Sequence, residues 1–162
     1  TNLVQNRLRM QSFDDSLAPK EQYAYLMDTA ENHPSASNFA MGVPAMIALD
    51  NGWVLILERE FLVTTSKLGS FVENKIYCVN PMASVAISQE KGLDTDSPYM
   101  HKTLVAVWKT SLGLLRQNLA NYEGMCLGPR LVDGSQVIVL CADSQDQYGG
   151  VLRDWFRTII IR

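Results

Sequence analysis

The feature that most constrains the fold is a tight-turn signal that occurs twice, each time between two strand-like runs. The first unit is Ala45–Leu49, Asp50-Asn51-Gly52 and Trp53–Arg59, and the second is Met125–Leu131, Asp133-Gly134 and Gln136–Ala142. Glycine tolerates the positive φ that tight hairpin turns require, and Asn or Asp can also adopt it. The pattern predicts two β-hairpins, and with them an antiparallel, all-β chain.

Other runs have the β-branched and aromatic residues that suit a pleated sheet. These predicted strands are Arg7–Phe13, Gln22–Met27, Lys75–Val79, Thr103–Trp108 and Thr158–Ile161. Loops are predicted at Asp28–Gly42, Thr64–Glu73 and Gln89–Lys102. One short helix is expected at Ser111–Leu119, because its leucines fall near one helical face.

The two hairpin units form a weak internal repeat, since a further strand follows each of them. This spacing predicts four-stranded antiparallel blades whose innermost strands are Ala45–Leu49 and Met125–Leu131. The chain would then hold the outer two strands of one blade, all four of the next, and three of a last one. A β-propeller closes with about four to eight blades, so residues 1–162 are expected to form a single domain within a larger ring. The alternative is a small antiparallel sandwich or sheet with a helix.

Composition excludes several classes of protein. The 162 residues are 47% hydrophobic and 19% charged, which is ordinary for a globular chain and excludes overall disorder. The net charge of −3 provides no basic surface for nucleic acid or anionic membranes. No apolar run approaches the length of about 20 residues that spans a bilayer. The three cysteines lie in apolar stretches, which predicts that they pack in the core.

Several stretches, taken together and in order, resemble the phytase-like β-propeller proteins, a family described as having esterase-like activity. They contain the patterns Tyr-x-Tyr-x-x-Asp, Leu-x-Glu-Arg and Asn-x-Glu-Gly. The stretches are Tyr23–Asp28, Val54–Arg59, Lys75–Val79 and Asn121–Leu131, followed by Asp133-Gly134 and Val137–Asp143. The resemblance covers about Arg7 to Ile161 and implies a partial β-propeller, the C-terminal portion of a longer domain. It also implies a periplasmic or extracellular protein.

Two positions depart from the family pattern. Ala45 stands where the family often has a glutamate early in the strand. Ala142-Asp143-Ser144-Gln145 stands where many members have Ser-Asp-Asp-Asn. Both departures favour the alternative of a non-catalytic propeller that binds a ligand or a protein partner.

Charged residues at strand ends are the candidates for chemistry. Glu58 and Arg59 are neighbours in a strand, so only one of them can face a given pocket. Glu58 could be a ligand or base, and Arg59 could bind a phosphate or carboxylate with two hydrogen bonds. The alternative is a structural ion pair between blades. Glu123 precedes an innermost strand, where it could bind a hard cation or act as an acid or base, or simply hold a turn.

Asp143 and Asp146 enter a loop closed by Gly149-Gly150 and could bind calcium together with loop carbonyls, or cap a turn. The resemblance implies hydrolysis of a small phosphate or carboxylic ester, assisted by calcium. In that hypothesis Glu58 and Glu123 are catalytic, Arg59 and Asn121 bind substrate, and Glu123, Asp143 and Asp146 hold the metal. The remainder of the propeller would be required as a partner, and exposed blade edges predict self-association of the isolated chain.

Overall fold

The computed structural model describes residues 6–30, 36–115, 117–144, 150 and 152–162. Within them the chain forms ten β-strands and one short 3-10 turn, η1 (Pro81–Ala83). The strands are β1 (Arg7–Phe13), β2 (Pro19–Leu26), β3 (Ala36–Ala48), β4 (Val54–Thr64), β5 (Phe71–Val79), β6 (Ala86–Ile87), β7 (Lys102–Ser111), β8 (Tyr122–Arg130), β9 (Gln136–Ala142) and β10 (Phe156–Ile161). The described part of the chain holds no helix long and apolar enough to cross a membrane.

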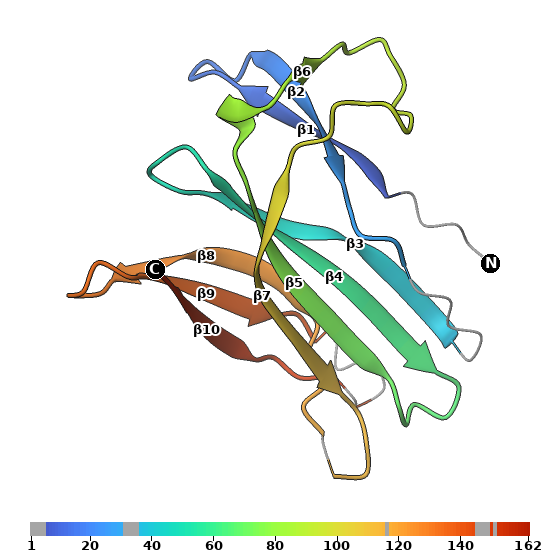
Figure 1. Ribbon diagram of the computed structural model, residues 1–162. Helices are drawn as coiled ribbons and strands as arrows, with labels where there is room; N and C mark the ends of the chain where they lie inside the picture. Colours follow the sequence, from blue (N-terminus) through green and yellow to red (C-terminus); the bar gives the residue numbers. More distant parts are fainter. Residues whose placement is uncertain (1–5, 31–35, 116, 145–149, 151) are drawn as a thin grey trace.

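The strands form three sheets, of order β1-β2-β6, β3-β4-β5-β7 and β8-β9-β10 (Figure 1). Every paired strand runs antiparallel to its neighbour. The middle sheet is a four-stranded meander that contains the predicted hairpin and the two predicted strands that follow it. The predicted all-β fold of antiparallel, blade-like sheets is therefore confirmed.

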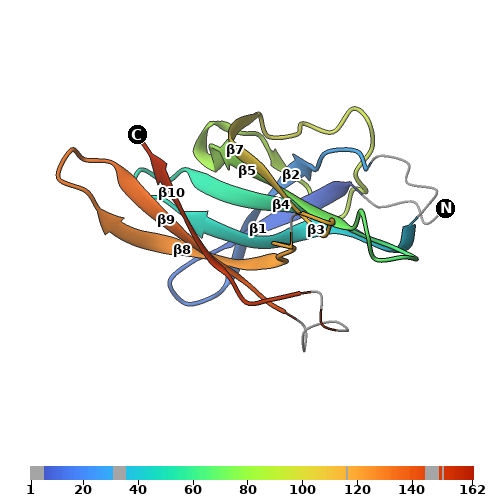
Figure 2. The same ribbon diagram turned by 90° about the horizontal axis from the view of Figure 1, so that it is seen from below.

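The middle sheet lies between the other two. The side chains of β4 alternate between its two faces, and each face packs against a different sheet. Ile56 packs with Tyr23 and Tyr25 of β2, whereas Leu55 and Leu57 pack with a core that includes β8 and β9. Seen from below, the β8-β9-β10 sheet lies nearest the viewer and crosses the middle sheet (Figure 2). Such stacking of successive meanders is the arrangement of neighbouring propeller blades.

Both predicted hairpin turns are confirmed. Gly52 and Gly134 have φ values of 82° and 85°, in the left-handed region that glycine adopts without steric cost. The amide of each donates a 2.9 Å hydrogen bond to the carbonyl of the residue three places earlier, Leu49 or Leu131. These bonds fix where each strand pair begins, and therefore which residues lie opposite each other.

Three sequence predictions of local structure are wrong. The strand predicted to end at Arg59 continues to Thr64, and β5 begins at Phe71, inside the predicted loop Thr64–Glu73. No α-helix occurs at the described positions of 111–119, where Leu112 and Gln117 form an isolated bridge. Leu119 is 1% and Leu115 99% exposed, so the leucines of the predicted face do not share one buried side. The predicted loop Asp28–Gly42 ends instead in strand, since β3 begins at Ala36 and pairs along β4. A register shift between Gly42 and Ala45 accommodates Pro44, which cannot donate to the sheet.

The cysteine prediction also fails for two of the three residues. Cys126 and Cys141 are exposed, and Cys78 is half-buried. Met125 and Leu140 point into the core shared with the middle sheet, so strand alternation turns the adjacent cysteines to the opposite face. An apolar neighbourhood in sequence therefore does not identify which face of a strand is buried.

Candidate functional site

Glu58 and Arg59, at the centre of β4, project toward different sheets. The Glu58 carboxylate contacts residues from the first sheet and from the chain that follows it, and the Arg59 guanidinium contacts the third sheet. Two charged groups of side chains therefore lie on opposite faces of the middle sheet. We call them the lysine network (Tyr25, Asp28, Glu58, Lys75, Tyr77 and Lys102) and the interface group (Arg59, Asn121 and Glu123).

Lys102 is the centre of the lysine network. Its Nζ lies 2.6 Å from Glu58 Oε1 and 2.6 Å from Asp28 Oδ1, so one ammonium joins two carboxylates. The Tyr25 hydroxyl donates to Glu58 Oε1 at 2.5 Å, and the Asp28 amide donates to Glu58 Oε2 at 3.0 Å. Both carboxylate oxygens of Glu58 therefore have partners, as a group only 2% exposed requires.

Asp28 receives two further donors. Lys75 Nζ lies 2.7 Å and the Tyr77 hydroxyl 2.8 Å from Asp28 Oδ2. Burial alone would raise the pKa of Asp28, but the hydrogen bonds from Lys102, Lys75 and Tyr77 together outweigh it and lower the pKa to about 2. Burial and the hydrogen bond to Glu58 raise the pKa of Tyr25, which keeps that hydroxyl protonated as a donor.

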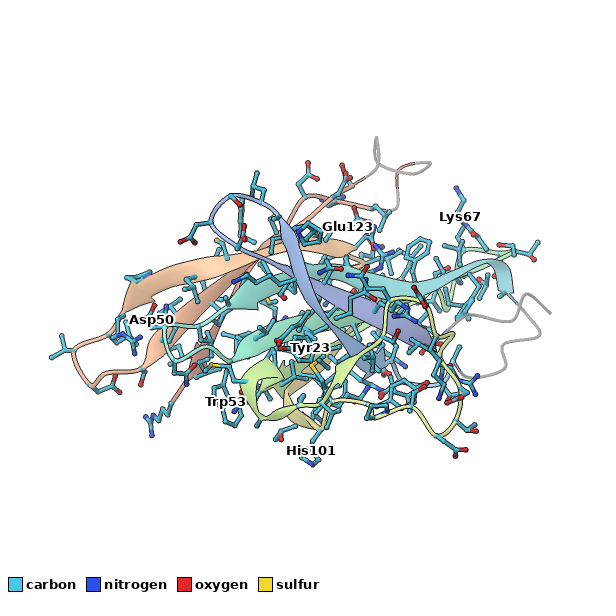
Figure 3. All side chains as sticks on the ribbon, turned by 90° about the horizontal axis from the view of Figure 1, so that it is seen from above. Tyr23, Asp50, Trp53, Lys67, His101 and Glu123 are labelled. Carbon is cyan, nitrogen blue, oxygen red and sulfur yellow. The ribbon has the colours of Figure 1, made fainter. Side chains whose placement is uncertain are left out.

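The interface group joins the middle sheet to the third. Arg59 Nη1 donates to Asn121 Oδ1 at 2.6 Å and forms an ion pair with Glu123 Oε1. Asn121 Nδ2 donates to the same Glu123 oxygen at 2.7 Å. The Glu123 side chain is 32% exposed, and no described residue hydrogen-bonds its Oε2. In Figure 3 Glu123 lies between Asp50 and Lys67, which mark turns at opposite ends of the long β4 strand.

Arg59 is the first of three cross-strand neighbours that each have one buried polar atom without a hydrogen-bond partner among the described residues. In the sheet register Arg59 lies opposite Asn74, and Asn74 lies opposite Trp108. Arg59 Nε, Asn74 Oδ1 and Trp108 Nε1 are buried, and none has a hydrogen-bond partner among the described residues. The Arg59 guanidinium therefore keeps donor capacity beyond the contacts of its Nη1.

The residues predicted to act together are only partly brought together. Arg59, Asn121 and Glu123 meet, and they do so as the ion pair between sheets that was the structural alternative for Arg59. Glu58 lies in the other group, so the two predicted catalytic carboxylates do not share one cluster. Asp143 lies near the interface group, since its amide donates to the Asn121 carbonyl at 2.9 Å.

A calcium ion would have to compete with the hydrogen-bond and ion-pair partners that the carboxylates already have. Calcium takes about six to eight oxygen ligands, and no group of three or more His, Cys, Asp or Glu gathers among the described residues. Glu58 is held by an ammonium and Glu123 by a guanidinium. Glu58 and Glu123 would have to exchange these partners for calcium, and calcium binding stays a prediction. Asp146 lies outside the described residues, so the loop that it shares with Asp143 stays a prediction.

Sequence reasoning missed Asp28, Lys75, Lys102 and the two tyrosine hydroxyls as members of a site. A signal for part of the network was present, since the Tyr-x-Tyr-x-x-Asp stretch contains Tyr25 and Asp28. Lys102 was placed in a loop, but it is the first residue of β7 and pairs with Val79. Lys102 meets Asp28, 74 positions away in sequence, only because the first two sheets stack.

The stacked antiparallel sheets define an all-β protein built of blade-like units. A family profile described as "Phytase-like: Esterase-like activity of phytase" matches residues 1–145. The chain therefore belongs to the phytase-like family. No curated protein and no solved structure matched the chain.

Proposed function

We propose that this protein hydrolyses small phosphate or carboxylic esters, and that the interface group is its reactive centre. The observation that carries the proposal is the Glu123 carboxylate, which Arg59 and Asn121 hold by Oε1 while the side chain remains 32% exposed. A fixed and accessible carboxylate beside a guanidinium suits general acid-base chemistry on an ester that develops negative charge. Membership in the phytase-like family supports the same class of reaction.

In the proposed reaction Glu123 takes a proton from water as the water oxygen bonds to the phosphorus or acyl carbon. The bond from that atom to the ester oxygen then breaks, and the departing alcohol takes the proton back from Glu123. Arg59 stabilises the anionic oxygen through the N–H groups of its Nη2, since its Nη1 contacts Asn121 and Glu123 and its Nε is buried. Asn121 fixes the Glu123 carboxylate through the 2.7 Å hydrogen bond.

Glu58 takes a positioning role in this proposal. Its exposed fraction of 2% keeps substrate away, and its hydrogen bonds hold Lys102 and the backbone at Asp28. Because Glu58 and Arg59 are adjacent in β4, fixing one fixes the strand that presents the other. Replacement of Glu58 is therefore expected to lower the free energy of unfolding and to leave the pH dependence of turnover nearly unchanged.

Turnover of p-nitrophenyl phosphate and p-nitrophenyl acetate by the full protein tests the proposal. We expect Glu123→Gln to lower kcat at least about 100-fold, as loss of a general acid-base group does. Glu90→Gln is the matched control, since Glu90 is exposed and lies far along the chain, after β6. Equal turnover by wild type and Glu123→Gln, or no turnover by the wild type, would contradict the proposal.

A non-catalytic propeller that binds a ligand or a protein partner is the second candidate. Ala45, at the position where a glutamate is expected in the family, packs against the core shared by the middle and third sheets. The Glu123 carboxylate is ion-paired with Arg59, as a structural contact between sheets would be. Ligand binding without turnover of either ester would favour this candidate.

We further propose that the chain works together with additional propeller blades. Large apolar side chains remain exposed on the third sheet: Phe156 is 79% and Ile160 58% exposed. Such residues on a sheet face are typical of a surface that another element covers. Self-association of the isolated chain in sedimentation experiments is the expected result, and a monomeric profile would contradict it.

A further inference from the structure

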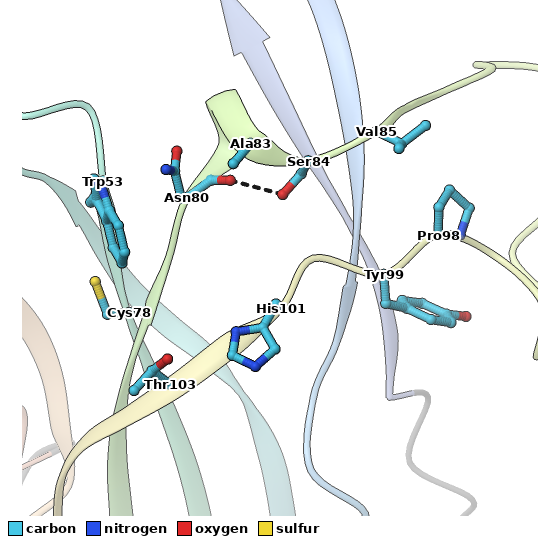
Figure 4. Close-up of a pocket in the computed structure, with 10 residues that line it drawn as sticks. All are labelled: Trp53, Cys78, Asn80, Ala83, Ser84, Val85, Pro98, Tyr99, His101 and Thr103. Atoms are coloured by element: carbon cyan, nitrogen blue, oxygen red, sulfur yellow. Dashed lines mark hydrogen bonds between the residues drawn. The ribbon is translucent and has the colours of Figure 1, made fainter.

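A cavity of about 480 Å³ lies at one end of the middle sheet. Its floor is made by the end of β5 and the start of β7, and its other walls come from the β3–β4 turn, η1 and the segment before β7 (Figure 4). The volume is in the range of small-molecule sites, about 300–1,000 Å³. None of the residues of the lysine network or of the interface group lines it, so the inference goes beyond the proposed hydrolysis.

The side chains that line the cavity favour an uncharged ligand over a charged one. The walls hold no carboxylate, ammonium or guanidinium side chain. Their polar groups are instead an amide, hydroxyls, a thiol and an imidazole, from residues that include Asn80, Thr103 and His101. A phosphate or carboxylate placed here would lose its hydration without meeting a fixed cation, which is costly.

One residue of the cavity wall presents an aromatic ring, and another holds a polar atom that no described residue pairs with. Trp53 is 39% exposed and lines the cavity. The Oδ1 atom of Asn80 is buried and has no hydrogen-bond partner among the described residues. Trp53 stands at one side of the cavity and Tyr99 at the other, with His101 and Thr103 between them (Figure 4).

We propose that this cavity binds a neutral saccharide. The C–H face of a sugar ring can pack on Trp53, while its hydroxyls both donate and accept hydrogen bonds with the exposed side chains of Thr103 and His101. A purely aromatic ligand would also stack, but it would leave those polar groups unpaired. The mixture of one exposed aromatic ring and several uncharged polar groups therefore fits a hydroxylated ring.

The test is a titration of the full protein with maltose, cellobiose and lactose, followed by the tryptophan indole N–H signals in a nitrogen–proton correlation spectrum. We expect at least one sugar to shift the Trp53 signal saturably. Thr103→Val should weaken that binding about fivefold to tenfold by removing one hydrogen bond. Thr103 is exposed, so this substitution is expected to leave the fold intact.

Trp155→Ala is the matched control, since Trp155 is 41% exposed and does not line the cavity. It should leave sugar binding unchanged, whereas Trp53→Ala should abolish it in a protein whose remaining signals keep their positions. The proposal is overturned if none of the three sugars gives a saturable shift of the Trp53 signal. It is also overturned if Thr103→Val binds as tightly as wild type, or if free indole alone saturates the site.

Discussion

Replacing Lys102 by methionine removes the ammonium that joins the first two sheets. Its Nζ lies 2.6 Å from both Glu58 Oε1 and Asp28 Oδ1, and Glu58 is only 2% exposed. Removing one partner of a fully buried ion pair costs about 3–5 kcal/mol. Glu58 keeps its bonds from Tyr25 and the Asp28 amide, and Lys102 is 20% exposed, so we expect a loss of about 2–3 kcal/mol in the free energy of unfolding.

Equilibrium urea unfolding at pH 7 measures this loss, with Lys109→Met as the matched control. Lys109 lies on the same strand, its side chain is 50% exposed, and its Nζ is 3.3 Å from Glu73 Oε1. An exposed pair of this kind contributes at most about 1 kcal/mol. In Lys102→Met/Glu58→Gln the loss should be smaller than the sum of the two single losses. Equal losses for Lys102→Met and Lys109→Met would refute the reasoning.

Three further predictions concern the loss of stability in acid, a glycine in a hairpin turn and the metal dependence of turnover. The pKa of Asp28 is about 2 in the folded protein and about 3.9 when unfolded, so its contribution is present above about pH 4 and is lost as the pH falls toward 2. After allowance for solvent screening, we expect about 1–2 kcal/mol of acid-linked stability, and Asp28→Asn should remove that part of the pH dependence of unfolding. Gly134→Ala should cost about 1–2 kcal/mol, because Gly134 has a φ of 85°, whereas Gly92→Ala, with nothing within 4 Å of the added carbon, should change melting far less. The proposed reaction uses no metal, so the chelator EGTA should leave ester turnover unchanged, and loss of turnover restored by added calcium would contradict that reaction.

Much of the fold could be predicted because its turns require particular residues. Gly52 and Gly134 identify the hairpins, and the hairpins define which strands pair. The extension of β3 back to Ala36 could not be predicted, since its polar and small residues become strand only by pairing with the long β4. The leucines of Ser111–Leu119 have helical spacing, but Leu119 is buried while Leu115 is 99% exposed, so they do not form the single buried face of a helix.

The site was predictable only to the extent that it depends on local geometry. Strand alternation correctly separates Glu58 from Arg59. Which partner each one meets depends on how whole sheets stack, and a single sequence holds no direct signal for contacts such as that of Lys102 with Asp28. For the same reason Glu58 and Glu123, both predicted to lie near strand ends, lie in different groups, and Glu58 lies at the centre of β4.

A double-mutant cycle on Arg59 and Glu123 tests the central claim most directly, because their contact exists only if the second and third sheets stack as described. The cycle compares unfolding free energies of wild type, Arg59→Gln, Glu123→Gln and the double variant. The side chains are 14% and 32% exposed, and we predict a favourable coupling of about 1–2 kcal/mol. A coupling energy indistinguishable from zero would contradict both the stacking of the sheets and the proposed reactive centre.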